Sequence, residues 1–293
     1  MFTPFAFVKN QPVVTGGGGS YPLTTAYLAA TGITGSTNIT ALQNLETDLN
    51  TYSLTSKIVA LYPMIGGTID YVKYNFMNPV DTDAGYRLIQ SGSTPTVNMF
   101  GVAGDGGDYP YPAVQINPSF NTNLPLVNID PYSNHFCTYV VDNPGAVNVA
   151  YPAESGVHPN SPNGTYTTMQ MNCYFYGNNL CSADNPSGAQ ATAGFSAGSD
   201  SKGFFVASRT SATNLMMYRQ RSGKTTAFNT NNIGTVDWTG QSDPQYLTIT
   251  TAGRAGSTRR QAFYCTGTGL TESQADDLYT AVQAYQTTLG RNI

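Results

Sequence analysis

Short apolar runs, separated by Gly, Pro, Asn and Asp, follow one another from Lys57 to Thr268 and predict β-strands. These runs are rich in aromatic and β-branched residues, which favour strands. The clear candidates are KIVALYPMI, AGYRLIQ, NHFCTYVV, TYTTMQMNCYFY, GFFVASRT, NLMMYRQ, PQYLTIT and RQAFYCT. No helical pattern lies between them, which excludes a βαβ fold. The pattern therefore predicts an all-β protein that forms a two-sheet antiparallel β-sandwich (jelly roll).

One helix is expected before the strands. Residues 37–52, TNITALQNLETDLNTY, carry apolar side chains at steps of three and four, which gives a helix one apolar face. Thr37 or Asn38 is expected to be the N-cap. The face is expected to pack on the sandwich, with a coiled-coil seam as the alternative. The apolar positions are Ile39, Leu42, Leu45, Leu49 and Tyr52.

A second helix is expected at the end, within Leu270–Ile293. Thr271 and Gln274 have the spacing of a capping box, and Glu272 stands near the positive end of the helix dipole. Gly290 is expected to stop the helix. An apolar stripe consists of Ala275, Leu278, Val282, Tyr285 and Leu289.

Residues 1–19 are predicted to form an arm. Its apolar side chains have strand-like spacing, two prolines restrict a strand here to a sheet edge, and four consecutive glycines form a hinge. We expect the arm to dock on a partner through Phe2, Phe5, Phe7 and Val8. The alternative is a first strand of the chain's own sheet. The expected organisation is thus an arm (1–19), a helical segment packed on the body (20–56) and the β-sandwich with its final helix (57–293).

The composition is unusually poor in charge. Charged residues make up 10% of the 293 residues, compared with roughly 25% in ordinary soluble domains. Such a polar but weakly charged surface suits a protein held in a large assembly or working outside a cell. A net charge of −4 argues against nucleic-acid binding. No apolar run is long enough to span a membrane, and the N-terminus does not have the pattern of a secretory signal peptide.

The four cysteines do not suggest zinc, since none forms a C-x-x-C pair. Cys173 and Cys181 flank YFYGNNL, which reads as a hairpin, so a cross-strand disulfide is one alternative. Free, partly buried thiols are favoured for a protein that assembles in a reducing cytosol.

The sequence offers little support for catalysis, and an enzyme is not expected. It has no H-E-x-x-H, G-x-S-x-G or P-loop motif. His135 lies near Cys137, but alternate residues of a strand share a face and usually just pack, and His158 lies in a Pro/Asn loop. A glycoside hydrolase stays open as an alternative because it needs only a pair of carboxylates across a cleft. The acidic candidates are Asp105, Asp108, Asp130 and Glu154.

No cofactor is expected. Asp105 and Asp108 offer oxygen ligands for Ca²⁺, but Asp-Gly is also an ordinary turn signal, which is the favoured interpretation. Sugar sites use aromatic faces framed by Asn and Asp. The candidate glycan-binding side chains are Tyr109, Tyr111, Tyr132 and Trp238.

Three stretches of the chain resemble a known module. In Ile58–Val102 a strand leads to a lysine-aromatic stretch, then an Asn-Pro-x-Asp turn, then AGYRLIQSG. KGFFVASRTSATNLMMYRQRSGK and the final helix ending in LGRN match it again. The resemblance is to laminin-G-like (concanavalin-A-like) jelly-roll modules of tailed-bacteriophage virion proteins. It is specific at Lys57–Gln90, Gly203–Arg219 and Gln261–Asn292, and loose from Gly92 to Tyr166.

This resemblance implies a structural protein of a phage virion, made in the host cytoplasm and exposed on the particle exterior. The short arm favours a capsid decoration or small appendage component over a full-length tail fibre. Other virion proteins and identical copies are the expected partners. A receptor- or glycan-binding adhesin is the first alternative, and it would bind a host-surface glycan. A glycan hydrolase is the second.

Overall fold

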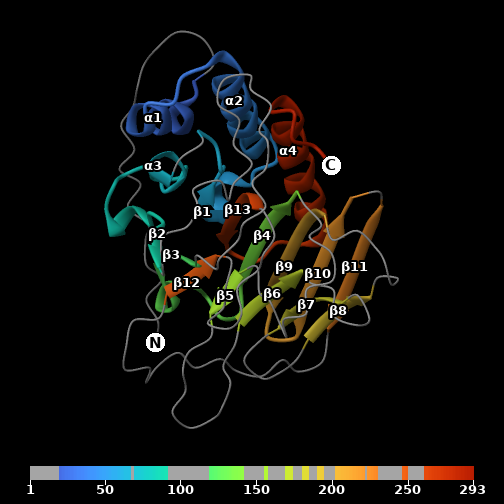
Figure 1. Ribbon diagram of the computed structural model, residues 1–293. Coiled ribbons are helices and arrows are strands. Elements are labelled where there is room, and N and C mark those ends of the chain that lie inside the picture. The colour runs from blue at the N-terminus through green and yellow to red at the C-terminus, as the bar shows by residue number, and fades with distance from the viewer. Residues whose placement is uncertain are drawn as a thin grey trace.

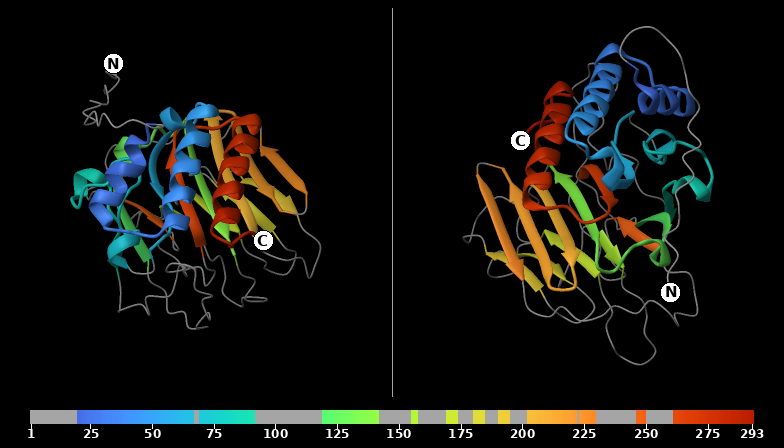
Figure 2. Two further views of the ribbon diagram at one scale, coloured as in Figure 1. Left: turned by 90° about the horizontal axis from the view of Figure 1, so that it is seen from above. Right: turned by 180° about the vertical axis from the view of Figure 1, so that it is seen from behind.

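Two antiparallel β-sheets and a layer of helices make up the protein (Figures 1 and 2). The computed structural model describes residues 20–66, 69–91, 119–141, 155–157, 169–173, 180–184, 190–194, 202–221, 223–229, 246–249 and 261–293. The expected pair of antiparallel sheets is confirmed.

Sheet A takes its strands from distant parts of the chain. In spatial order these are β1 (Ile58–Tyr62), β13 (Gln261–Gly267), β4 (Asn134–Val140), β9 (Gly203–Ser211), β10 (Asn214–Gln220) and β11 (Lys224–Asn229). The last strand before the final helix therefore lies between the first strand and β4. All five strand pairs are antiparallel.

Sheet B packs against one face of sheet A. Its order is β2 (Ile89–Ser91), β3 (Ser119–Pro125), β12 (Tyr246–Ile249), β5 (Ser155–Val157), β6 (Met169–Cys173), β7 (Leu180–Asp184) and β8 (Gln190–Gly194). The hairpin expected between Cys173 and Cys181 is confirmed, because β6 and β7 pair with these two residues opposite each other.

Helices cover the other face of sheet A, as Figure 2 shows from two sides. They are α1 (Pro22–Thr31), α2 (Ser36–Thr51), the single turn α3 (Ile69–Val72) and α4 (Glu272–Thr288). Short 3₁₀ turns occupy Thr55–Lys57, Asp83–Gly85 and Leu126–Asn128. Among these described helices, none has both the length and the apolar character that a bilayer span requires.

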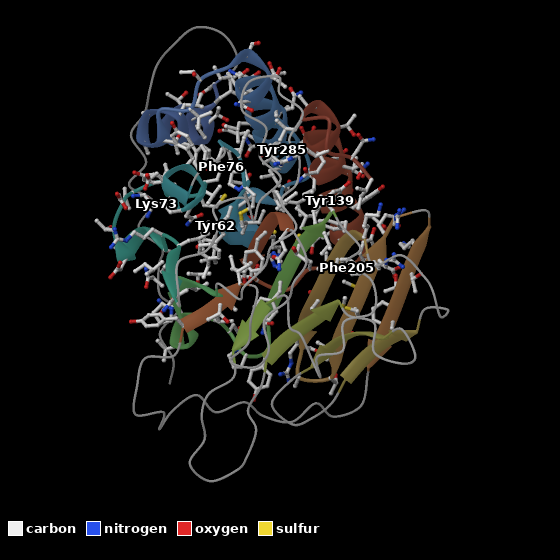
Figure 3. The ribbon with its side chains drawn as sticks, viewed as in Figure 1. Tyr62, Lys73, Phe76, Tyr139, Phe205 and Tyr285 are labelled. Atoms are coloured by element: carbon white, nitrogen blue, oxygen red, sulfur yellow. The ribbon has the colours of Figure 1, made fainter. Side chains whose placement is uncertain are left out.

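Sheet A is buried on both faces, which explains its continuous apolar runs. Alternate residues of β9 illustrate this: Phe205 lies in the core between the sheets, whereas Phe204 and Val206 lie in the core beneath the helices. Figure 3 shows Phe205 on the sheet side, and Tyr139 and Tyr285 on the helix side. Both cores exclude water, so burial of apolar surface on two sides stabilises sheet A.

The terminal helices agree with their expected patterns, with two corrections. The Thr271–Gln274 capping box is present, and the apolar stripe of α4 faces the core. α2 occurs where a helix was expected, but its N-cap is Gly35. Thr37 and Asn38 were wrong as N-caps because both lie inside the helix, where the Asn38 side-chain amide donates to the Thr34 carbonyl at 3.2 Å.

The prediction of one N-terminal helix was also wrong, because α1 precedes α2. The sequence does carry two signals for α1, Pro22 in its first turn and Gly32 after its last turn. In the structure, Gly32 adopts a left-handed conformation with φ of 71°. Its sequence gives only a weak apolar stripe, and its stability depends on contacts with α2 and on the Tyr27 ring, which packs edge-on against Phe76.

AGYRLIQ was wrong as one strand. Asp83–Gly85 form a 3₁₀ turn, Tyr86 is left-handed with φ of 56°, and β2 begins only at Ile89. Polar contacts of Tyr86 and Arg87 override the strand propensity of this segment. The remaining candidate runs each contain a strand.

Candidate functional site

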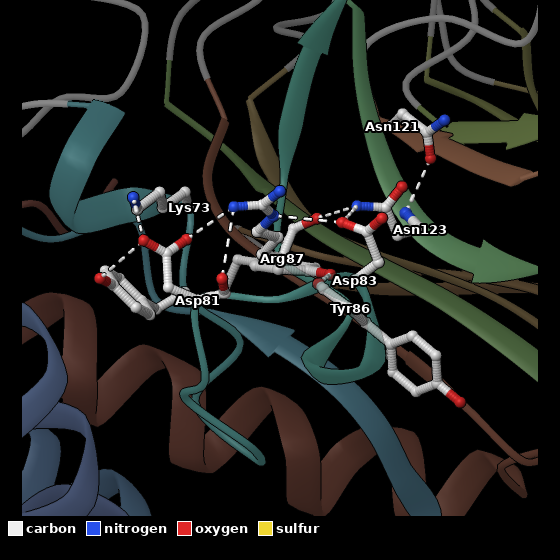
Figure 4. Close-up of polar contacts among 9 residues, drawn as sticks. Lys73, Asp81, Asp83, Tyr86, Arg87, Asn121 and Asn123 are labelled. Carbon is white, nitrogen blue, oxygen red and sulfur yellow. Dashed lines mark hydrogen bonds and ion pairs between the residues drawn. The ribbon is translucent and has the colours of Figure 1, made fainter.

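One polar cluster of the described residues lies in the loop from Lys73 to Leu88, where Asp81 contacts two cations. Its carboxylate oxygens lie 2.8 Å from Lys73 Nζ and 3.0 Å from Arg87 Nη1. Arg87 Nε reaches Asp83 Oδ1 at 3.2 Å (Figure 4). We call these four residues the ion cluster. Lys73, Asp81 and Arg87 come from the lysine-aromatic stretch, the Asn-Pro-x-Asp turn and the AGYRLIQSG sequence that carry the resemblance, and Asp83 lies between the last two motifs.

Asn75 ties this loop to β1. Its side-chain oxygen accepts hydrogen bonds from the backbone N–H of Leu61 at 2.9 Å and of Met77 at 3.1 Å. Its amide donates to the carbonyls of Val59 and Gly85, at 3.3 and 3.1 Å. Asn75 is fully buried, and its one side chain satisfies four backbone groups, of which the Leu61 N–H and the Gly85 carbonyl lie in buried bonds.

The loop is also bound to its neighbours at Tyr86 and Arg87. The Tyr62 hydroxyl donates to the Tyr86 carbonyl, which holds the left-handed turn. From β3, the Asn123 amide donates to Asp83 Oδ1 at 3.3 Å and to the Arg87 carbonyl at 3.1 Å (Figure 4). These contacts explain why the segment departs from the extended backbone that its sequence favours.

Electrostatically, the ion cluster is internally neutralised. Hydrogen bonds from Lys73 and Arg87 lower the pKa of Asp81, and the hydrogen bond to Asp81 raises the pKa of Lys73. Exposed ion pairs contribute little individually, but they restrict the loop's geometry. The ion cluster therefore stabilises the conformation of the loop, since each of its charged groups already contacts an opposite charge.

Asp81→Asn is expected to flatten the acid dependence of stability. Because folding lowers the pKa of Asp81, its contribution is present above the ordinary value of 3.8 and is lost as pH falls through the folded value. The loss is at most about 1 kcal/mol, since solvent screens these exposed pairs. Urea unfolding at pH 7 and pH 3 measures it. Asp277→Asn on α4 is the control, and an equal change there would refute this role for Asp81.

A second cluster lies where the connection to β4 meets the end of β9. The buried Arg209 donates to the carbonyls of Ser211 and Ala212, and its guanidinium lies 5.1 Å from the centre of the Tyr132 ring. The exposed Asp130 accepts the Tyr132 N–H at 2.8 Å. Burial lowers the pKa of Arg209. Tyr132 is therefore a half-buried ring fixed by a cation, and Asp130 is the one carboxylate that the described residues place beside it.

A third cluster lies in the core beneath the helices. His135, Cys137 and Cys265 are fully buried on adjacent strands. His135 Nδ1 lies 2.6 Å from the Thr268 carbonyl oxygen, and Nε2 lies 3.7 Å from Cys265 Sγ. The two cysteines are free thiols, as expected, and they are fully rather than partly buried. The sequence suggested only that His135 and Cys137 share a face; Cys265 was missed because it is distant in sequence.

The other predicted site residues lie outside the described residues. They are Phe2, Phe5, Phe7, Val8, Asp105, Asp108, Tyr109, Tyr111, Glu154, His158 and Trp238. Within the described part of the chain, no group of three His, Cys, Asp or Glu residues is placed to hold a metal ion. Tyr132 is thus the one glycan candidate whose surroundings the structure describes.

Comparison with known proteins gives no family model and no curated relative that matches. Among solved structures, domain 4 of AbnA, a GH43 extracellular arabinanase from Geobacillus stearothermophilus, is 11% identical, with 76% of this chain and 98% of that one covered and a TM-score of 0.42. The enzymatically active domain of tailspike protein 2 from bacteriophage CBA120 is 10% identical, covering 60% and 26%, with a TM-score of 0.38. A Trypanosoma rangeli sialidase is 12% identical, covering 52% and 23%, with a TM-score of 0.25. These values are too low to carry a functional argument, which rests on the chain's own residues.

Proposed function

We propose that this chain is a structural protein of a tailed-phage particle, a decoration or small appendage component displayed on the exterior. Residues 1–19 attach it to other virion proteins or to identical copies. Its body is a laminin-G-like jelly roll rather than an enzyme. The observation that carries the proposal is that the three stretches resembling such modules, although far apart in sequence, meet in one continuous unit.

Two glycines mark the contacts between these stretches. A Cβ atom at Gly267 would lie 1.9 Å from the Lys57 carbonyl oxygen, and one at Gly269 would lie 2.1 Å from the Arg209 carbonyl oxygen. Only glycine allows such close backbone approach. Gly267 thus joins the last strand to the first stretch, and Gly269 joins it to the second.

The final helix completes the unit. The Tyr285 hydroxyl donates to the Pro63 carbonyl at 2.8 Å, and Arg291 donates to the Met64 carbonyl at 2.8 Å. The Ser208 hydroxyl donates to the Leu270 carbonyl at 2.8 Å and accepts the Leu270 N–H at 2.7 Å. Polar side chains of one resembling stretch thus bind backbone groups of another. This favours a scaffold in which the three stretches form one structural unit, while the arm and the loops carry the attachment and display functions.

A glycan-binding module is the second candidate, and Tyr132 favours it. Arg209 restricts the ring, so a sugar that packs on the exposed part would cost the protein little ordering entropy. The exposed Asp130 beside it offers a hydrogen-bond acceptor for hydroxyl groups.

The arm is tested by replacing its three phenylalanines. Phe2→Ala, Phe5→Ala and Phe7→Ala together are expected to reduce incorporation into particles at least tenfold, because the apolar contacts of a docking strand are removed. Incorporation is measured by quantitative mass spectrometry of particles assembled with each variant. Thr3→Ala with Gln11→Ala is the matched control, since it changes the arm but keeps its apolar side chains.

The outcomes separate the two candidates. Equal incorporation of the triple variant and the control would refute docking through the arm. Absence of the wild-type chain from purified particles would refute the virion function. Binding of the wild-type chain to a glycan array, with loss of binding in Tyr132→Ala, would then establish the glycan-binding module instead.

A further inference from the structure

All four cysteines of the chain stand in directly opposed cross-strand pairs. Cys137 of β4 lies opposite Cys265 of β13 in sheet A, and Cys173 of β6 lies opposite Cys181 of β7 in sheet B. A cysteine in a reduced core needs no cysteine partner, so ordinary packing does not explain why Cys137 stands opposite Cys265. The pairing points to chemistry between the thiols.

The geometry of the sheet A pair suits a disulfide. Directly opposed residues of an antiparallel ladder have Cα atoms about 4.5 or 5.5 Å apart, and a disulfide spans about 4.4–6.8 Å. Both side chains also lie in the same core, beneath the helices. The backbone therefore needs little movement to accept a bond between the two sulfur atoms.

We propose that Cys137 and Cys265 are a redox-active dithiol that closes into a cross-strand disulfide, joining β4 to β13, when the protein meets a peroxide. His135 is the positioning residue for Cys265. The dithiol is reduced when the chain folds and becomes oxidised in an oxidising environment. The inference stands independently of the proposed function.

His135 makes the two thiols differ in acidity. Because the Thr268 carbonyl only accepts, Nδ1 of His135 carries a hydrogen, and Nε2 of the neutral ring is an acceptor facing Cys265 Sγ at 3.7 Å. Burial raises the pKa of Cys137. Burial also opposes ionisation of Cys265, but the contacts with Cys137 and with the His135 ring, which takes up the thiol proton, outweigh it and lower the pKa of Cys265 to about 6. Cys265 is thus the attacking thiolate.

The reaction balances with hydrogen peroxide as the oxidant. Cys265 gives its proton to His135 and attacks one peroxide oxygen; the S–O bond forms, the O–O bond breaks, and the leaving hydroxide takes the proton from His135 to become water. Cys137 then attacks the sulfur of the resulting sulfenic acid; the S–S bond forms, the S–O bond breaks, and a second water leaves with the Cys137 proton. Two thiols lose two electrons, and one peroxide becomes two waters.

Access limits the rate. Both sulfur atoms lie beneath α2 and α4, and both residues have no exposed surface. A peroxide is small enough to enter through local opening of the helix layer, whereas a bulky disulfide reagent is not. We therefore expect the native pair to oxidise more slowly than thiols of the unfolded chain, and to do so without dimerisation.

The test uses the native wild-type protein. It is treated with hydrogen peroxide, quenched with catalase, unfolded in N-ethylmaleimide to block free thiols, and digested without reduction for peptide mass spectrometry. A peptide linking Cys137 to Cys265 is the expected result. Recovery of both as maleimide adducts, under conditions that oxidise the unfolded protein, would overturn the proposal, as would linkage of either to Cys173 or Cys181.

His135→Gln tests the positioning role. Glutamine keeps an amide that can donate to the Thr268 carbonyl, but it removes the imidazole acceptor, so cross-link formation is expected to slow about tenfold. Thr138→Val is the matched control, because Thr138 is buried on the same strand and points to the other face. A rate in His135→Gln equal to wild type, or equal slowing in Thr138→Val, would refute the role of His135.

Discussion

Asn75→Ala is expected to lower the free energy of unfolding by about 3 kcal/mol, since a buried polar group without a partner costs about 1–3 kcal/mol. The truncation leaves the N–H groups of Leu61 and Met77 and the carbonyls of Val59 and Gly85 without the partner that they share. Water does not replace it, because Asn75 is fully buried. Urea unfolding at neutral pH measures the change.

Asn75→Asp separates the hydrogen bonds from the loss of volume. An ionised aspartate has nearly the same shape, still accepts from Leu61 and Met77, but donates to neither Val59 nor Gly85. We expect it to be at least as destabilising as alanine, because it also buries a charge. Asn128→Ala, on the surface, is the control and should change stability by less than about 0.5 kcal/mol. A small effect of both Asn75 variants would disprove its role in holding the loop.

The second large effect is expected at Glu46. This carboxylate of α2 is 1% exposed and accepts the N–H groups of Leu23 and Thr24, at 2.9 and 2.8 Å. These are first-turn donors of α1 that have no partner within their own helix. Glu46→Ala is expected to cost about 2–3 kcal/mol, because both donors are left buried and unsatisfied. Thermal or urea unfolding measures the loss.

Hydrogen exchange shows whether the loss is local to α1. The Leu23 and Thr24 amides should lose protection in Glu46→Ala, whereas those of α4 should lose only what the global destabilisation explains. Glu46→Gln keeps one acceptor oxygen and should fall between wild type and alanine. Asn44→Ala, on the exposed side of α2, is the control. Unchanged protection at Leu23 and Thr24 would show that α1 is held by its apolar contacts alone.

Much of the fold could be predicted because its signals are local. The Thr271–Gln274 capping box and the apolar stripe set α4 within a few turns of chain. The apolar runs of β4, β9, β10 and β13 set their strands in the same way. The prediction that AGYRLIQ is one strand was wrong because this segment depends on distant partners. The Tyr62 hydroxyl hydrogen-bonds to the Tyr86 carbonyl, and Arg87 forms ion pairs with Asp81 and Asp83. Strand propensity contributes too little to compete with these contacts.

The candidate sites depended more on distant partners. Tyr132 was identified from its type and loop position, but its ring is fixed by Arg209, which no local pattern connects with it. His135 and Cys137 were noted as neighbours on one strand. The proposed thiol chemistry also requires Cys265, which the pairing of β13 with β4 brings opposite Cys137. Such register is a property of the assembled sheet, since it depends on strands far apart in sequence.

The sequence by itself determined the β-rich class and the helices α2 and α4. Those features follow from hydrophobic periodicity and capping, which act over a few residues. Only the tertiary structure decided that helices cover the outer face of sheet A, that Lys73, Asp81, Asp83 and Arg87 form one ion cluster, and that cysteines occupy opposed positions of paired strands in both sheets. The physical reason is that burial and hydrogen-bond satisfaction act over the whole chain, and they select one arrangement among the many that local preference allows.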